Sequence, residues 1–177
     1  IQTSNPERIA QAKSDFPDAV ICNNAEELLA QKLDLVVVAS INTAHESNAK
    51  SAIDAGVAVV VDKPMATTLA GTRELFNYAE SKNVPITVYF NRLWDSDTLT
   101  IKSVLKNEAI GKAHRFDGRF ERFRPDLAAQ SWREQLRSQH GGGLLLDLQS
   151  HLISTAIDCF GPAKLKYANV KSIRGAS

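Results

Sequence analysis

The amino-acid sequence predicts an α/β protein: a Rossmann-type, doubly wound parallel sheet followed by the start of a second α/β domain. Short apolar runs without polar alternation, such as residues 35–39 and 57–61, are separated by helical segments that carry one apolar stripe. This order is typical of parallel β-α-β units, whose right-handed crossovers place helices on both faces of a buried sheet. After residue 90 the pattern changes. We therefore predict a first domain at residues 1–90 and a second at residues 91–177.

Each helix of the first domain has a local start signal. Ser4 or Asn5 can cap a helix that has Pro6 in its first turn, Asn24 can cap a second, and Thr68 can cap the one before the last strand. The predicted strands are residues 19–22, 35–39, 57–61 and 85–90. Four strands with helices between them fit one doubly wound sheet.

The second domain begins with different patterns. We expect a helix near residues 98–106, a strand at 113–124, a mostly buried apolar helix at 144–160 and another strand at 163–173. In the segment 113–124, Phe116, Gly118 and Phe120 alternate with charged residues, which indicates a strand with one exposed face.

Composition excludes several classes of protein. The 177 residues are 44% apolar and 23% charged, with a formal charge of +1, so we expect neither a nucleic-acid partner nor a membrane partner. The apolar runs are shorter than the roughly 20 residues of a membrane span. Cys22 and Cys159 lie far apart and match neither a disulfide framework nor a thiolate metal site. These features favour a reduced, cytoplasmic setting.

Lys63 is the first candidate for chemistry. It follows the strand 57–61, and ligands of open parallel sheets bind beyond the carboxyl ends of the strands. Pro64 restricts the Lys63 backbone to extended conformations and so fixes where the side chain emerges. The alternative is a solvated lysine in an ordinary strand-to-helix turn.

Asp147 and His151 form the second candidate, since residues four apart in a helix share one face. A carboxylate beside an imidazole suits a general acid or base near neutral pH. The alternative is a helix-surface ion pair. The other histidines lie at unrelated spacings, so we expect no metal site.

Three consecutive glycines, Gly141, Gly142 and Gly143, precede this helix. They do not match a phosphate loop, because no strand precedes them and no Lys-Ser or Lys-Thr pair follows. Close backbone approach or a flexible entry to the helix explains them better.

Together these motifs resemble the glucose-fructose oxidoreductase, inositol dehydrogenase and MocA (Gfo/Idh/MocA) family. The matching stretches are VVVASINTAHESNAKSAIDAGVAVVVDKPMATT, YFNRLWD, IGKAHRF and GGGLLLDLQSHLISTAIDCFG, in the family's order. Residues 91–95 and 120–125 resemble the branch that includes NADP-dependent scyllo-inositol dehydrogenases. In two departures, Asp62 stands for the commoner glutamate and Gln149 for the usual glycine.

The resemblance implies an NAD(P)-dependent dehydrogenase that acts on a hydroxyl of a polyol, cyclitol or sugar. Its second domain would carry a large, mainly antiparallel open sheet that forms a homodimer or homotetramer. The implied catalytic residues are Lys63, which holds the reacting oxygen, His151, which exchanges the proton, and Asp147, which supports His151. These three, with Arg92 and Trp132, are the implied substrate contacts. A non-catalytic, nucleotide-sensing protein of the same fold is the alternative.

For the cofactor, the resemblance implies contacts from the first domain and the start of the second. The implied residues are Thr3, Ser4, Asn5, Ser40, Ile41, Asn42, His45, Asp62, Lys63 and Asn91. Small hydroxyl residues at positions 3 and 4, where NAD-dependent relatives carry an acidic residue, leave room for a 2′-phosphate, so we expect NADP, with NAD as the alternative. The family's G-x-G-x-x-G turn is not in the sequence. The resemblance therefore implies an internal fragment of a longer protein.

Overall fold

The computed structural model describes residues 1–123, 125–126 and 131–171. Its sheet has three parallel strands in the order β1-β2-β3, with β1 at Leu35–Val38, β2 at Ala58–Asp62 and β3 at Ile86–Tyr89. Val38 pairs with Val61 and Asp62 with Tyr89, so the carboxyl ends of the strands lie together. This edge is where a ligand site of an open parallel sheet forms.

The helices of the first region begin at the predicted caps. Asn5 Oδ1 accepts hydrogen bonds from the backbone of Glu7 and Arg8 at the start of α1 (Pro6–Asp15). The side chains of Asn24 and Thr68 cap α2 (Ala25–Leu29) and α4 (Leu69–Ser81) in the same way. The helix α3 (His45–Asp54) follows a short 3₁₀ turn, η1 (Asn42–Ala44).

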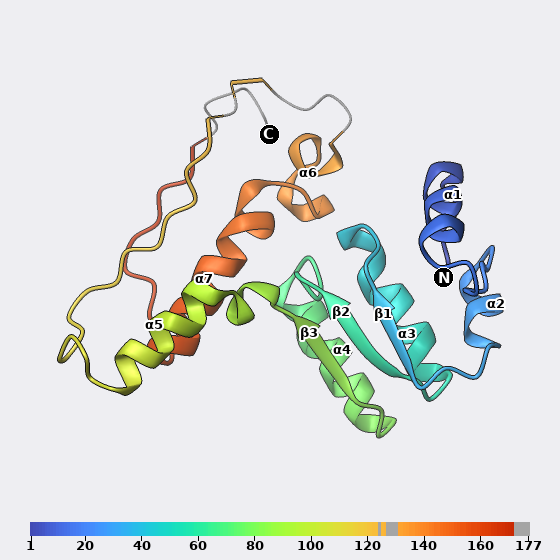
Figure 1. The fold of residues 1–177 in the computed structure, drawn as a ribbon, viewed down its shortest axis with the longest axis horizontal. Coiled ribbons are helices and arrows are strands. Elements are labelled where there is room, and N and C mark those ends of the chain that lie inside the picture. The colour runs from blue at the N-terminus through green and yellow to red at the C-terminus, as the bar shows by residue number, and fades with distance from the viewer. Residues whose placement is uncertain (124, 127–130, 172–177) are drawn as a thin grey trace.

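The core lies between the sheet and two helices. The helices α3 and α4 lie on one face of the sheet, as Figure 1 shows. Their buried side chains belong to the same core cluster as those of the strands. Ile53, Leu75, Val59 and Val61 are the large apolar residues buried most completely. The opposite face of β1 is open: Leu35 and Val37 are 49% and 63% exposed. The prediction that this strand is buried on both faces was therefore wrong for the described residues, because α3 and α4 cover only one face.

Residues 19–22 do not form the predicted fourth strand. Cys22 makes a single parallel bridge with Gln2, and its backbone N donates to the Ile1 carbonyl at 2.8 Å. These two short segments pair with each other and not with β1, and an isolated two-stranded pair is marginal. Both cysteines are free thiols.

After β3 the chain continues through η2 (Asn91–Trp94) into α5 (Ser96–Lys106). Two short elements follow, α6 (Trp132–Gln135) and the 3₁₀ turn η3 (Ser138–His140), and then the π-helical turn η4 (Leu145–Gln149) leads directly into α7 (Ser150–Phe160). The α5 prediction is confirmed, and the predicted single helix at 144–160 is a π turn joined to an α-helix.

Two predicted strands are not strands. The described residues of 113–124 and of 163–173 form no ladder; positions 124, 172 and 173 lie outside the described residues. Alternation of side chains needs a paired neighbour to become a strand, and none pairs with them among the described residues. The predicted burial of residues 144–160 was also wrong, since Leu144, Leu145, Ile153 and Ile157 are 45–53% exposed.

Candidate active site

Lys63 lies immediately after β2, and its side chain is only 11% exposed. Its Nζ donates to the Asp147 carbonyl oxygen at 2.6 Å and to Asp147 Oδ1 at 3.0 Å. Its backbone N donates to Asp62 Oδ1 at 2.8 Å, and the Lys63–Pro64 peptide bond is cis. The solvated-lysine alternative is therefore wrong: the ammonium joins the first region to the second.

Asp147 lies in the π-helical turn η4, and its carboxylate contacts two positively charged side chains. Lys63 Nζ and Arg133 Nε lie 3.0 and 3.5 Å from its Oδ1. Single π turns occur often at functional sites, because the wider turn redirects a side chain. The carboxylate oxygen that accepts from Lys63 is not bonded to His151. This oxygen therefore holds the lysine, and the expected support of His151 by Asp147 stays a prediction.

His151 is 7% exposed, in the first turn of α7. Its ring meets the Phe120 ring edge-on, with centroids 6.4 Å apart, and the Arg92 guanidinium lies 5.7 Å from the centre of that phenyl ring. Nδ1 has no hydrogen-bond partner among the described residues. A buried unpaired ring nitrogen costs about 1–3 kcal/mol and calls for a functional explanation. A substrate hydroxyl is one partner that would satisfy it.

The surroundings of His151 lower its pKa below the ordinary 6.5. Burial is the largest cause, followed by the positive charges of Lys63 and Arg92, while Asp147 and Asp62 oppose the shift. The neutral imidazole is therefore favoured at neutral pH, and a neutral imidazole can accept a proton.

The loop after β1 connects the strand ends to the glycine-rich segment. Asn42, only 7% exposed, donates from Nδ2 to the Gly141 carbonyl at 2.7 Å. Gly141 has φ +84°, and a Cβ there would lie 2.9 Å from the Asn42 Cβ. Close backbone approach thus explains this glycine, as the sequence indicated. This contact uses one of the two N–H groups of the Asn42 amide.

Two other residues of this loop differ in accessibility. Ile41 is 48% exposed and can meet a ligand. His45 is 1% exposed, with its ring nitrogens 2.8 and 3.1 Å from the carbonyl oxygens of Pro64 and Ser40. Its ring therefore has no polar atom left for the cofactor contact that the resemblance implied.

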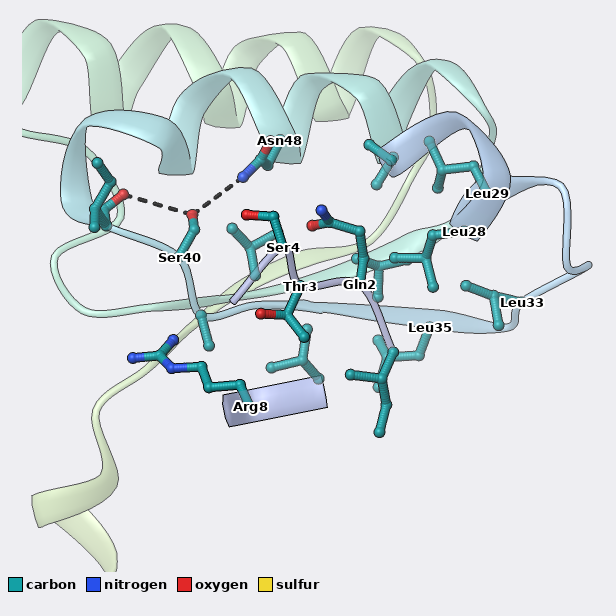
Figure 2. Close-up of a pocket in the computed structure, with 18 of the residues that line it drawn as sticks. Gln2, Thr3, Ser4, Arg8, Leu28, Leu29, Leu33, Leu35, Ser40 and Asn48 are labelled. Atoms are coloured by element: carbon teal, nitrogen blue, oxygen red, sulfur yellow. Dashed lines mark hydrogen bonds between the residues drawn. The ribbon is translucent and has the colours of Figure 1, made fainter. Parts of the chain in front are cut away.

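A groove of about 770 Å³ opens beside β1. Figure 2 shows its polar end, with Thr3, Ser4, Arg8 and Ser40, and its apolar end with several leucines. Asn5 also lines it, but its side-chain oxygen caps α1. Hydroxyls and a guanidinium beside apolar walls suit the ribose and adenine part of a dinucleotide.

The remaining predicted residues lie around the lysine and histidine. Arg92 pairs with Asp95 at 2.7 Å in η2, where Asn91 is also placed. Trp132 stacks beneath the Arg133 guanidinium at 4.4 Å, next to the Asp147 contact. The structure thus brings Lys63, Asp147, His151, Arg92 and Trp132 to one area, whereas Thr3, Ser4 and Ser40 line the groove.

Sequence reasoning missed Arg8 and Arg133. Arg8 lines the polar end of the groove, and the signal was a cation one turn into the helix that follows the hydroxyl residues. Arg133 had no such signal, because its contact with Asp147 depends on how α6 packs.

No group of three or more His, Cys, Asp or Glu residues in residues 1–123, 125–126 and 131–171 could hold a metal ion. Within the same ranges no helix has the length and apolar character needed to cross a membrane.

Both regions of the chain match models of one protein family. Residues 1–90 match the oxidoreductase family with an NAD-binding Rossmann fold, GFO_IDH_MocA, and residues 98–176 match the GFO/IDH/MocA C-terminal domain. This chain belongs to the Gfo/Idh/MocA family. The expected family and the NAD-binding Rossmann fold of the first domain are confirmed.

The chain is also similar to individual oxidoreductases. The chain is 35% identical over 175 residues to the scyllo-inositol 2-dehydrogenase (NADP(+)) IolW of Bacillus subtilis, covering 98% of this chain and 47% of that protein. It is 39% identical over 152 residues to an uncharacterised oxidoreductase of Escherichia coli, YdgJ, covering 85% and 43%. The oxidoreductase yvaA of Bacillus subtilis has a solved structure with TM-score 0.80 and 33% identity, covering 91% of this chain and 44% of that one. The chain spans less than half the length of these relatives.

Proposed function

We propose that the protein is an NADP-dependent dehydrogenase that oxidises a hydroxyl group of a polyol, cyclitol or sugar. The observation that carries the proposal is the convergence of Lys63, Asp147 and His151 from two regions of the chain. The NADP-dependent scyllo-inositol dehydrogenase among the relatives supports this substrate class. Bound nicotinamide would supply the hydride acceptor.

The residues of the chain divide the remaining work. The neutral His151 ring takes the hydroxyl proton, and the buried Lys63 ammonium stabilises the negative charge that develops on the oxygen. Asp147 holds Lys63 through the contact of its Oδ1 with Nζ at 3.0 Å, and Arg133 Nε lies 3.5 Å from the same oxygen and so fixes the carboxylate. The Phe120 ring packs against His151 and limits its rotation.

Turnover of the full-length protein tests the proposal. We expect NADP⁺ reduction with at least one member of a panel of inositols and sugars. Lys63→Met should lower kcat by about 10²–10³-fold, because a preorganised charge is lost. Lys82→Met is the control, since Lys82 is 48% exposed on α4's C-terminal cap. No turnover on any substrate, with tight NADP(H) binding, would favour a nucleotide-sensing protein instead.

We further propose that Arg8 binds the 2′-phosphate of NADP. An arginine near this position accommodates that phosphate in Rossmann folds, and Arg8 lines the groove beside Thr3 and Ser4. Arg8→Ala should weaken NADP⁺ binding about 10-fold or more and leave NAD⁺ binding unchanged. Lys13→Ala, an exposed cation on the same helix, is the matched control. Equal losses for both cofactors would contradict the assignment.

A further inference from the structure

His45 links the carboxyl ends of two neighbouring strands. Ser40 follows β1 and Pro64 follows β2, and the His45 ring lies between their carbonyl oxygens. Nδ1 is 2.8 Å from the Pro64 oxygen and Nε2 is 3.1 Å from the Ser40 oxygen. The ring is 1% exposed, so water does not compete for these contacts.

The Pro64 carbonyl belongs to the residue directly after Lys63. A group that holds this carbonyl therefore holds the turn from which the lysine side chain emerges. Lys63 must reach the Asp147 carbonyl and carboxylate at 2.6 and 3.0 Å, across the two regions of the chain. Small displacements of the turn move the ammonium directly, and misplacement by about 1 Å can cost about 100-fold in rate.

The start of α3, where His45 lies, and the turn before it are held by two further contacts. Asn42 donates to the Gly141 carbonyl at 2.7 Å, and Asn48 Nδ2 donates to Ser40 Oγ at 3.1 Å. The backbone on either side of His45 is therefore fixed by hydrogen bonds, as the role of a positioning residue requires.

We propose that His45 is a positioning residue: its Nδ1 contact with the Pro64 carbonyl sets the place of the Lys63 ammonium. The proposal rests on the proposed function for its kinetic consequence and not for its structural one. Of the two ring contacts, the one with Pro64 is the one that matters to Lys63. A neutral imidazole has one N–H, and the proposal places it on Nδ1, which donates to the Pro64 carbonyl.

Two amide variants separate the contacts. The side-chain nitrogen of an asparagine stands close to the place of Nδ1, and that of a glutamine close to the place of Nε2. His45→Asn therefore keeps a donor toward Pro64, whereas His45→Gln keeps one toward Ser40. His45→Leu removes both.

The experiment measures these three variants in the full-length protein. Steady-state kinetics give kcat and the KM for cofactor and substrate. Acetylation by acetic anhydride, followed by peptide mass spectrometry, gives the reactivity of Lys63 relative to Lys82 in the same sample. Lys82 is an internal reference because it is 48% exposed and far from His45 in sequence.

We expect His45→Leu and His45→Gln to lower kcat about 100-fold and to speed acetylation of Lys63, with cofactor KM little changed. His45→Asn should return kcat to within about 10-fold of the unsubstituted protein and slow acetylation again. Equal behaviour of the asparagine and glutamine variants would overturn the proposal, as would unchanged Lys63 acetylation in both.

The two readouts also separate this proposal from the proposed function. A protein without any dehydrogenase activity would refute the function, while the acetylation pattern would still test the role of His45. If His45→Leu does not fold, the comparison of asparagine with glutamine decides alone.

Discussion

Residues 1–90 bury a continuous apolar core, whereas the described residues after 90 bury almost no apolar side chain. Among the described residues, every buried apolar residue lies between Cys22 and Val84. Beyond residue 90, only Thr98, Gly141, Gly142 and His151 are buried among the described residues. The buried apolar core of the described residues therefore belongs to the first region.

Two hydrogen-bonded contacts join the two regions at the candidate site. Lys63 bonds to Asp147, and Asn42 bonds to Gly141, across 84 and 99 residues of sequence. Stability and chemistry thus depend on different residues. Substitutions in the core should change unfolding, and substitutions at these contacts should change turnover.

The largest expected effect is on turnover. His151→Asn should lower kcat by about 10²–10⁴-fold, because the proton acceptor is lost, while the melting temperature changes little. The control is His114→Asn, an exposed histidine of the same region. Steady-state kinetics and calorimetry on the full-length protein measure both quantities. If the melting temperature falls enough to explain the lost activity, the expectation that site residues affect turnover and core residues affect stability would be wrong.

Core truncation should give the largest loss of stability. Leu75, which is 0% exposed, contributes to the core from α4. Leu75→Ala should lower the free energy of unfolding by about 2–5 kcal/mol. Ile153→Ala is the matched truncation in the second region, where Ile153 is 53% exposed, and should cost less than about 1 kcal/mol. Chemical denaturation measures both. Similar losses would show that α7 is as well packed as α4.

A smaller loss of stability is expected on substitution of Gly142, in the segment Gly141 to Gly143. A Cβ on Gly142 would lie 2.0 Å from the Leu136 carbonyl oxygen, so Gly142→Ala should cost about 1–3 kcal/mol. It should also lower kcat, since Gly143 accepts the backbone hydrogen bond of Asp147 at 3.2 Å. Gly111→Ala has open space and only a positive φ of 67°; it should cost about 1 kcal/mol and spare kcat. Unchanged kcat in Gly142→Ala would contradict the coupling.

The smallest effect is a change in the titration of His151. Burial, Lys63 and Arg92 lower its pKa below 6.5. Oxidation needs the neutral ring, so its rate should be level near neutral pH and fall as pH drops through the lowered pKa. Lys63→Met removes a positive charge, so the pKa should rise toward its ordinary value. NMR titration of the His151 ring in both proteins measures this, and a lower pKa in the variant would contradict the assigned cause.

Local signals in the sequence were sufficient where neighbouring residues decide the structure. The caps at Asn5, Asn24 and Thr68 start helices as predicted, because a side chain reaches backbone groups only two or three residues away. The apolar runs that became β1 and β2 were equally clear. Segments that need a distant partner were predicted less well: residues 19–22 and 113–123 form no strand ladder.

The candidate site shows the same limit. The sequence alone determined which residue types stand after a parallel strand and on one helical turn, and so named Lys63, Asp147 and His151. Only the tertiary structure decided their partners: Asp147 contacts Lys63 and Arg133, and His45 turns inward to two carbonyl oxygens. The physical reason is that hydrogen bonds act over about 3 Å. Contacts across 84 residues are therefore set by packing, which local sequence patterns do not encode.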